Sequence, residues 1–198
     1  MLFNSCVILM GLIGVMEVAA YQIALNVSSL AFMFPFGLSM AGAVRVGLAK
    51  GAGNPQAVRR SGLITIFTCV GAIMLFALPI ALWPEGVSAL YLNIEAADNA
   101  KVVLIVAAFL PIAATFMFFD AVQVAANQCL RGLKDVNLPM IFTAISYWGI
   151  GFPVAYYLGL KTSVGANGIW YGLLAGLISA SIFLGARFWY LAWKKAPP

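Results

Sequence analysis

Six long apolar runs, separated by short polar or glycine-rich joints, make up almost the whole chain. The runs cover residues 2–16, 18–44, 62–83, 102–130, 138–160 and 168–193. A helix crosses the hydrocarbon core of a membrane with roughly 20 predominantly apolar residues, whereas the strands of a membrane barrel alternate apolar and polar residues. Residues 71–83 show no such alternation. The pattern therefore predicts an all-α, polytopic membrane protein in which residues 1–198 form one six-helix transmembrane bundle.

The second and fourth runs are longer than a perpendicular crossing requires, so these helices should tilt, bend or project beyond the hydrocarbon. Proline removes a backbone donor and crowds the preceding helical turn, which makes it a kink site. The second to fifth runs each contain such a site, in order Pro35, Pro79, Pro111 and Pro153.

Composition supports the membrane interpretation and excludes most kinds of enzyme. The chain is 64% hydrophobic and only 9% charged, against about 45–50% apolar and about 25% charged in soluble domains. It has no histidine, the usual general base and the commonest metal ligand. Its three cysteines lie scattered in separate apolar runs, without disulfide or metal-ligand spacing. We expect no enzymatic activity, no cofactor and no structural metal.

The net charge of +5 reflects 11 Lys and Arg residues that punctuate the apolar runs instead of forming a nucleic-acid-binding surface. Six crossings would place both termini on one side. That side would carry nine basic residues, against Lys101 and Lys161 on the other. Because Lys and Arg accumulate in cytoplasmic loops, we predict that both termini are cytoplasmic. The nine are Arg45, Lys50, Arg59, Arg60, Arg131, Lys134, Arg187, Lys194 and Lys195.

The joint at residues 45–61 is glycine-rich and turns at Asn54 and Pro55 before a new helix begins. Two interpretations are open: a solvated hairpin at the lipid headgroups, which base rates favour, or a hinge. In the last run, Gly172 and Gly176 have the spacing that lets two membrane helices approach closely.

Asp120 is the strongest functional signal, because it is the only acid placed well inside an apolar run. An ionised carboxylate at this depth costs about 2.5–3.5 kcal/mol on insertion scales, so it should face the bundle interior or water and mark an ion or substrate path. Burial disfavours the charged form, which would let Asp120 exchange a proton or bind Na⁺. The alternative is a structural carboxyl tied to a neighbouring helix.

Polar side chains form a stripe on each of two runs. Gln123 and Asn127 lie about 60° and about 20° from Asp120 around the helix axis. In the second run, a similar stripe consists of Gln22, Asn26 and Ser29. The two stripes predict a shared cavity, although each amide alone could equally form an interhelical hydrogen bond. Met117, among the aromatic residues before Asp120, is a further pathway-lining candidate, but base rates favour a core position for it.

Several stretches are similar to the multidrug and toxic compound extrusion (MATE) transporters, in their bacterial NorM-like branch. They follow the family order along nearly the whole chain, and those that include Asn26 and Asp120 are the most specific. They are AYQIALNVSSLAFMFP (20–35), RVGLAKG (45–51), DAVQV (120–124), LRGLKD (130–135), SYW (146–148) and GANGIW (165–170).

The resemblance implies a fold, a site and a function. Family members have two six-helix lobes related by an internal repeat, and this chain resembles the second, carboxy-terminal lobe. An acid at the Asp120 position helps bind the coupling cation in such proteins, whereas the other acid of this lobe falls about where Met1 begins and has no match here. Because hydrophobicity also starts at the first residue without a polar flank, we expect a truncated first helix.

The predicted function is an antiporter of the bacterial inner membrane that exports amphiphilic, often cationic, drugs in exchange for Na⁺ or H⁺. Its partners would be membrane lipid, the drugs and a missing amino-terminal lobe, with no nucleic acid. The alternative is a membrane fragment that does not transport without a separate first lobe.

The predicted topology is testable with reporter fusions. A reporter after Lys195 or within residues 51–55 should report the cytoplasm, and one near Glu95 should report the exterior, because of the basic-residue asymmetry. A cytoplasmic signal near Glu95 would contradict the six-span topology.

Overall fold

The computed structural model describes residues 2–92 and 99–194. The expectations that concern Glu95 and Lys195 lie outside these residues. The described part is helical, without a strand: α1 (Leu2–Ile13), α2 (Val15–Gly51), α3 (Pro55–Leu82), α4 (Pro84–Ala89), α5 (Ala100–Gly132), α6 (Asn137–Ala144), the π-helix η2 (Ile145–Gly151), α7 (Phe152–Leu160) and α8 (Ala166–Lys194).

Five of the predicted spans have the length and composition to cross a membrane. They are α2, α3, α5, α8 and the continuous unit α6–η2–α7, which extends from Asn137 to Leu160. The all-α membrane class is therefore confirmed. The predicted count of six crossings is not, because α1 has only 12 residues where a crossing takes about 20.

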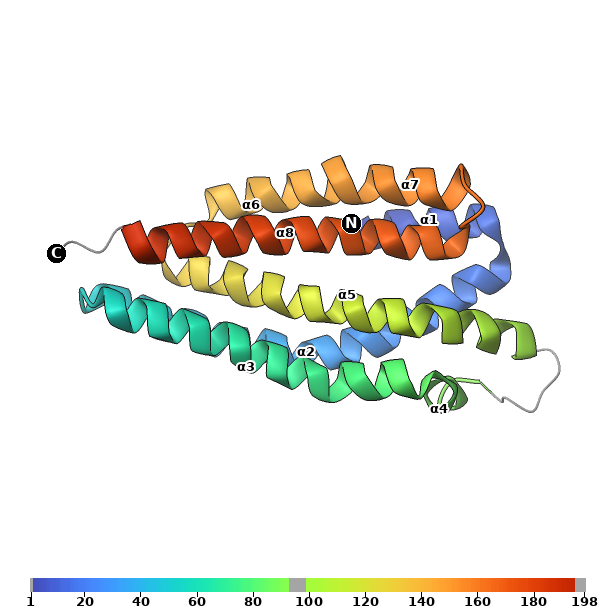
Figure 1. Cartoon of the computed structure of the whole chain (residues 1–198), viewed down its shortest axis with the longest axis horizontal. Coiled ribbons are helices and arrows are strands. Elements are labelled where there is room, and N and C mark those ends of the chain that lie inside the picture. Colours follow the sequence, from blue (N-terminus) through green and yellow to red (C-terminus); the bar gives the residue numbers. More distant parts are fainter. Residues whose placement is uncertain (1, 93–98, 195–198) are drawn as a thin grey trace.

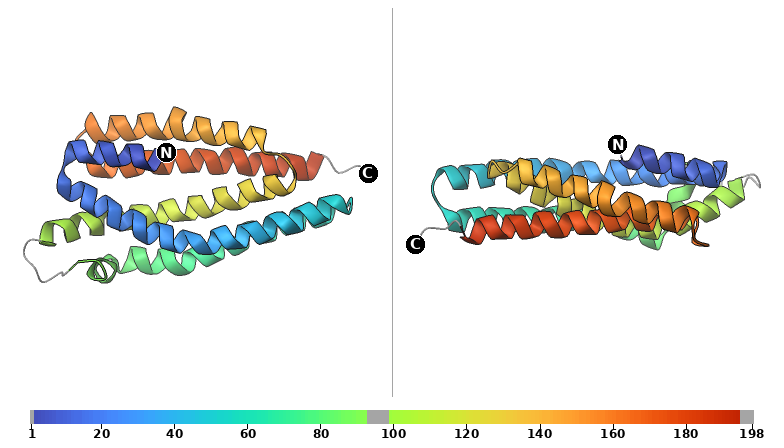
Figure 2. Two further views of the ribbon diagram at one scale, coloured as in Figure 1. Left: turned by 180° about the vertical axis from the view of Figure 1, so that it is seen from behind. Right: turned by 90° about the horizontal axis from the view of Figure 1, so that it is seen from above.

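The long helices lie side by side along the length of the molecule (Figures 1 and 2). α2 packs against α3 and α5, α5 also packs against α8, and α7 packs against α8. α1 contacts both α2 and α7. α2 and α5, with 37 and 33 residues, are each about 50 Å long or more at 1.5 Å per residue, as their apolar runs predicted.

The joint at residues 45–61 is shorter than the sequence suggested. α2 continues past Arg45 to Gly51, and α3 begins at Pro55, so only residues 52–54 are outside a helix. The turn at Asn54 is confirmed: its side chain accepts a hydrogen bond from the Ala57 backbone amide at 3.0 Å and caps α3. Arg45 appeared to end the apolar run. It lies near the polar end of the bundle, where the helix can continue because a charged side chain there has no burial cost.

One of the four predicted kink prolines, Pro153, differs from the other three in its position within the helices. Pro35, Pro79 and Pro111 lie inside α2, α3 and α5, which remain single helices. Pro153 is the second residue of α7, which begins directly after the π-helical segment Ile145–Gly151. Since Pro153 has no amide to donate to the carbonyl four residues earlier, the regular hydrogen-bond ladder is interrupted at this point.

Close packing of α8 on the preceding helices confirms the role predicted for its two glycines. A Cβ atom on Gly172 would lie 2.3 Å from the Cα and N atoms of Ala155, and one on Gly176 would lie 3.2 Å from the Cα atom of Gly151. The backbones themselves are in contact, as in small-xxx-small pairs of membrane helices.

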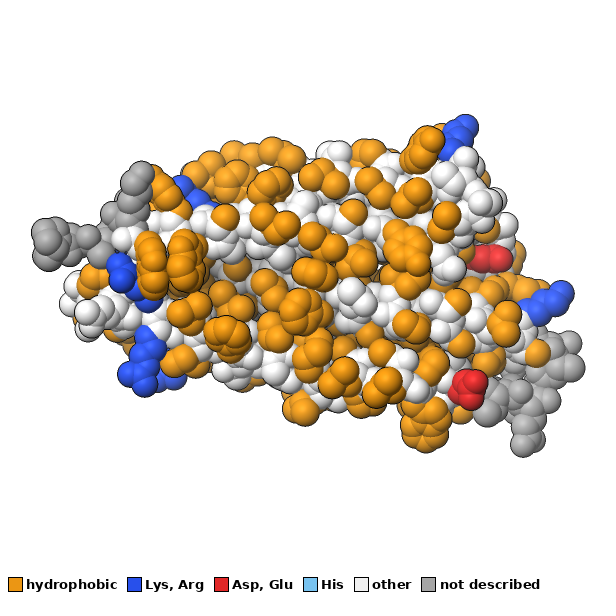
Figure 3. Space-filling model, in the orientation of Figure 1, with side chains coloured by type: hydrophobic (Ala, Val, Ile, Leu, Met, Phe, Trp, Pro, Cys, Tyr) orange, Lys and Arg blue, Asp and Glu red, His pale blue; other side chains and the backbone are white. Residues whose placement is uncertain are grey.

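The charged side chains visible on the face of the described bundle in Figure 3 lie toward its two ends. Figure 3 shows Lys and Arg gathered at the end where the α2–α3 turn lies, with apolar side chains over most of the visible surface between the ends. Lys101 is the second residue of α5, and Lys161 directly follows the end of α7, so both lie at the opposite end. This distribution agrees with the charge asymmetry in the sequence, and the orientation of the termini stays a prediction.

Gly172→Leu should destabilise the fold because the new side chain would collide with the backbone at Ala155, which cannot rotate away. We expect a loss of about 1–3 kcal/mol or more, measured as a lower thermal transition in detergent. Gly185→Leu in the same helix is the matched control, since a Cβ atom there has no neighbour within 4 Å. Equal transitions for the two variants would contradict the close α7–α8 packing.

Candidate functional site

Asp120 lies in the interior of α5, roughly 18 Å from the end of the helix at Gly132. Its side chain is partly buried. The neighbouring carbonyl of Phe119 accepts a hydrogen bond from Ser181 Oγ at 2.8 Å, which ties this level of α5 to α8. The position of the carboxylate is therefore set by two of the longest helices in the bundle.

A cavity of about 360 Å³ opens beside Asp120. Four elements contribute to its wall: α1, α2, α5 and the π-helix η2. Its lining combines aromatic side chains with oxygen-bearing ones, and consists of Phe3, Leu25, Ser28, Ser29, Phe32, Phe116, Asp120, Gln123 and Tyr147.

Within the part of the chain that the structure describes, no hydrogen bond or ion pair joins the Asp120 carboxylate to another residue. The other polar groups around the cavity are neutral: the hydroxyls of Ser28, Ser29 and Tyr147, and the Gln123 amide. Ser28 Oγ donates to the Ala24 carbonyl at 2.8 Å, which leaves its oxygen lone pairs available. A carboxylate with neutral oxygens around it suits a small hard cation or a proton.

An ordered set of aromatic rings supports one wall of the cavity. Phe116 meets Phe3 and Trp170 edge-on, with ring centroids 5.9 and 5.8 Å apart respectively. Trp170 in turn lies 5.3 Å from the ring of Tyr21. Such contacts fix the rings in place, and their faces attract organic cations.

The structure brings together only some of the predicted site residues. Ser29, Asp120 and Gln123 line one cavity. Gln22 and Asn26 are exposed on the surface of the described bundle, and Asn26 Oδ1 accepts a hydrogen bond from the Tyr91 hydroxyl at 2.8 Å.

The remaining two candidates lie outside the cavity lining. Asn127 is half-buried on the same side of α5 as Asp120, about two turns closer to Gly132. Met117 is 2% exposed and packs in the apolar core. This is the position that base rates favoured for it.

The α2 stripe, which was chosen for its amides, is not centred on the side of α2 that lines this cavity. The residues of α2 that line the cavity are Leu25, Ser28, Ser29 and Phe32, spaced i, i+3, i+4 and i+7. This face is rotated by roughly 80° from the mean direction of Gln22, Asn26 and Ser29. The signal that could have identified this face is its mixture of serines with Leu25 and Phe32. Ser28 was missed because these apolar residues flank it.

Tyr147 was also missed as a cavity residue, because regular helical spacing does not hold across a π-helix. It belongs to η2, which interrupts the fifth apolar run. π-Helical turns often occur at functional sites, where they redirect side chains. The adjacent Ser146 Oγ is buried and has no hydrogen-bond partner among the described residues.

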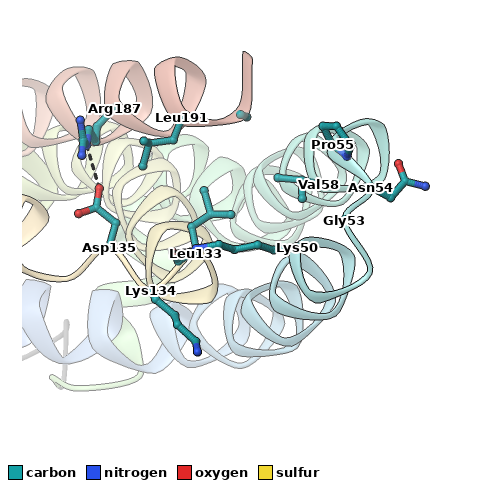
Figure 4. A pocket seen from close by; sticks show the side chains of 11 residues that line it. Lys50, Gly53, Asn54, Pro55, Val58, Leu133, Lys134, Asp135, Arg187 and Leu191 are labelled. Atoms are coloured by element: carbon teal, nitrogen blue, oxygen red, sulfur yellow. Dashed lines mark hydrogen bonds and ion pairs between the residues drawn. The ribbon is translucent and has the colours of Figure 1, made fainter. Parts of the chain in front are cut away.

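A second cavity, of about 450 Å³, lies at the basic end of the bundle (Figure 4). Three of its four charged side chains are already paired: Arg187 Nε donates to Asp135 Oδ2 at 2.8 Å, and Lys50 Nζ donates to the Leu133 carbonyl. Lys134 points away from Arg187 and Leu191 in this view. The contacts hold the turn after α5 to α2 and α8, which is a structural role.

Among the described residues, no group of three or more acidic or cysteine side chains could hold a metal ion. A cation at the first cavity would therefore be held by one carboxylate and neutral oxygen atoms. The long apolar helices define the class of the protein, which is a multi-pass membrane protein with an acid in its interior.

The chain belongs to the MATE family, since the family model MatE matches residues 1–157. It is 41% identical over 187 residues to the multidrug resistance protein NorM of Burkholderia vietnamiensis, a match that covers 94% of this chain and 40% of the relative. It is 40% identical over 197 residues to the probable multidrug resistance protein NorM of Mesorhizobium japonicum, which covers 100% of this chain and 42% of that protein.

Solved structures show the same fold at lower sequence identity. The chain matches an inward-facing multidrug resistance MATE family transporter with a TM-score of 0.84 and 21% identity, over 100% of this chain and 44% of that one. A eukaryotic MATE transporter matches with a TM-score of 0.79 and 21% identity, over 98% and 44%. The chain thus spans about two fifths of the length of the relatives and structures that it matches.

Two Asp→Asn substitutions should have opposite effects on stability. Asp120→Asn removes a charge that has no partner in the described structure, so thermal stability in detergent should stay equal or increase. Asp135→Asn breaks the ion pair with Arg187, whose side chains are 17% and 24% exposed, and should cost up to about 1 kcal/mol. A larger loss for Asp120→Asn than for Asp135→Asn would show that Asp120 is a structural carboxyl.

Proposed function

We propose that this chain is the carboxy-terminal lobe of a cation-coupled antiporter that exports amphiphilic, often cationic, compounds in exchange for Na⁺ or H⁺. The observation that carries this proposal is the unpartnered Asp120 carboxylate at the wall of a cavity inside the bundle. The membership in a transporter family supports it. The membrane would be the bacterial inner membrane, with the basic end of the bundle on the cytoplasmic side.

The carboxylate can couple two flows if cation and drug occupy it by turns. With Na⁺ or H⁺ bound, the negative charge in the cavity is neutralised, and an organic cation loses its electrostatic partner. When the small cation leaves, the restored charge and the aromatic faces of Phe3, Phe32 and Phe116 attract an organic cation. Exclusive occupancy of this kind links uptake of the coupling ion to release of the drug.

The neutral oxygens around Asp120 support either coupling ion. For Na⁺, the serine hydroxyls and the Gln123 amide would complete an oxygen-coordinated site. For H⁺, the carboxyl alone is sufficient, because its removal from water favours the protonated form.

Transport requires a second wall that this chain does not supply. The relatives extend well beyond the matched region, because the match covers only about two fifths of their length. In transporters built from repeats, the binding site lies at the interface between the two halves. We therefore propose an amino-terminal lobe as the necessary partner. The alternative is that the chain by itself is a membrane fragment without transport activity.

The test of the proposal is Asp120→Asn in a protein in which this chain is joined to a first lobe. The substitution keeps size and hydrogen-bonding reach but removes the titratable charge, so cation-driven drug efflux should be abolished while membrane insertion is retained. Uptake of a fluorescent organic cation into inverted vesicles, driven by an imposed outward gradient of Na⁺ or H⁺ from the lumen, measures this directly.

Two further variants make the experiment specific to the charge. Asp120→Glu keeps the carboxylate but displaces it by one methylene, and should retain partial efflux with altered dependence on the coupling ion. Gln123→Ala removes only a neutral ligand and should cause a smaller loss. Normal efflux by Asp120→Asn at unchanged expression would refute the coupling role, and activity of the unjoined chain would refute the need for a first lobe.

A further inference from the structure

A third cavity, of about 450 Å³, lies in the groove between α2 and α3. Its wall differs in chemistry from the other two because it carries two arginines and three hydroxyl groups but no acid. The lining residues are Leu38, Ala41, Gly42, Arg45, Ala57, Arg60, Ser61, Ile64, Thr65 and Thr68.

The two arginines face each other across the antiparallel pair of helices at the same height. Arg45 precedes the end of α2 at Gly51 by roughly 9 Å, and Arg60 follows the start of α3 at Pro55 by roughly 8 Å. Both side chains are exposed, and neither forms an ion pair or hydrogen bond within the described residues. Two unneutralised positive charges are thus held at one level of the groove.

This arrangement differs from that of the adjacent basic residue Arg59. The Arg59 guanidinium donates from Nε to the Ala192 carbonyl at 2.9 Å and lies 3.9 Å from the ring centroid of Trp193. Arg59 is therefore committed to holding the end of α8. Arg45 and Arg60 have no such internal partner, so their charges are available to a ligand.

The groove continues from the arginines toward the apolar middle of the bundle. Ser61, Thr65 and Thr68 follow one another along α3, and Leu38 on α2 lies level with Thr68, about 10 Å farther from the turn than the arginines. Leu38 and Ile64 are 39% and 46% exposed. A charged end with hydroxyl groups, followed by an apolar trough, matches the order of polarity in a phospholipid, from headgroup to acyl chain.

Small residues create the space for such a ligand. Ala41, Gly42 and Ala57 lie on the facing sides of the two helices, and a Cβ atom on Gly42 would lie 2.2 Å from Thr65 Cγ2. α2 and α3 are thus closely packed at the floor of the groove, and the arginines stand at its rim.

We infer that the α2–α3 groove binds one anionic phospholipid of the membrane leaflet at the basic end of the bundle, with its phosphate between Arg45 and Arg60. The charge complementarity specifies an anionic ligand. The apolar trough specifies one with acyl chains. This inference is independent of the role proposed for Asp120, which lies in a different cavity.

The test is photolabelling of the protein in vesicles. The protein is purified as it assembles in the bacterial membrane and is then transferred to vesicles of phosphatidylethanolamine and phosphatidylglycerol. The probe is phosphatidylglycerol with a photoreactive acyl chain, and mass spectrometry measures labelling of the peptides that contain Leu38 and Ile64. Arg45→Gln combined with Arg60→Gln should reduce this labelling at least fivefold, since each basic residue near the surface is worth on the order of fivefold in affinity.

Matched variants separate a site from general surface charge. Arg131→Gln combined with Lys134→Gln removes two exposed charges at the same end but outside the groove, and should leave the labelling unchanged. Arg45→Lys combined with Arg60→Lys keeps both charges and should retain most of it. A photoreactive phosphatidylcholine reports folding, because its weaker labelling of the same face should be equal in every variant.

Three results would overturn the inference. Equal losses in the two Gln pairs would show only bulk attraction to the anionic membrane. Suppression of labelling by millimolar inorganic phosphate would show that the groove binds a free anion. Absence of labelling by either lipid would show that protein, such as another lobe, covers the groove.

Discussion

Every backbone donor and acceptor within the hydrocarbon must find its partner inside the protein, and this constraint determines the architecture. It explains why the described residues are helical almost throughout and why turns such as residues 52–54 occur only at the ends of the bundle. It also explains the local irregularities. Where Pro153 withdraws a donor, the ladder changes to π-helical spacing instead of unwinding, and that change places Tyr147 at the cavity wall. The need to satisfy the backbone therefore contributes to the shape of the site.

The same low-dielectric environment gives charge two distinct roles in this chain. At the basic end, charges close to water bind neighbouring elements, as Arg59 binds the end of α8 and Asp135 binds Arg187. Inside the bundle, Asp120 lacks such a partner within the described structure. A protein that needed only packing at this position could have used an apolar side chain at no electrostatic cost. The contrast between paired end charges and one unpaired interior charge is the physical basis of the proposed coupling.

Much of the fold could be predicted from the sequence because membrane helices depend on local composition. The apolar runs located the long helices, the Asn54 and Pro55 pair located the α2–α3 turn, and the spacing of Gly172 and Gly176 indicated close packing. The short helix α4 gave no such signal, since it lies between apolar runs and is only 6 residues long.

The lining of the site was harder to predict than its central acid. Asp120 stands out by depth alone, whereas the cavity-facing side of α2 depends on how that helix is rotated against α5. That rotation is set by packing between helices, and amide side chains on the outer face, such as Asn26 with its Tyr91 partner, obscured it. Tyr147 could not be predicted because residue spacing does not reveal a π-helix.

The π-helix has a geometric consequence for the whole unit from Asn137 to Leu160. Because its hydrogen bonds span one residue more than those of an α-helix, α6 and α7 are out of phase by about 100° relative to a single regular helix. A helical wheel drawn through all three elements would assign the wrong face to one end, so the lipid-facing and bundle-facing positions of α6 and α7 must be read separately. If η2 had α-helical spacing, Tyr147 would be rotated about the helix axis relative to Gly151. The π-helix therefore sets the angle between the side chain at the cavity wall and the glycine that contacts Gly176.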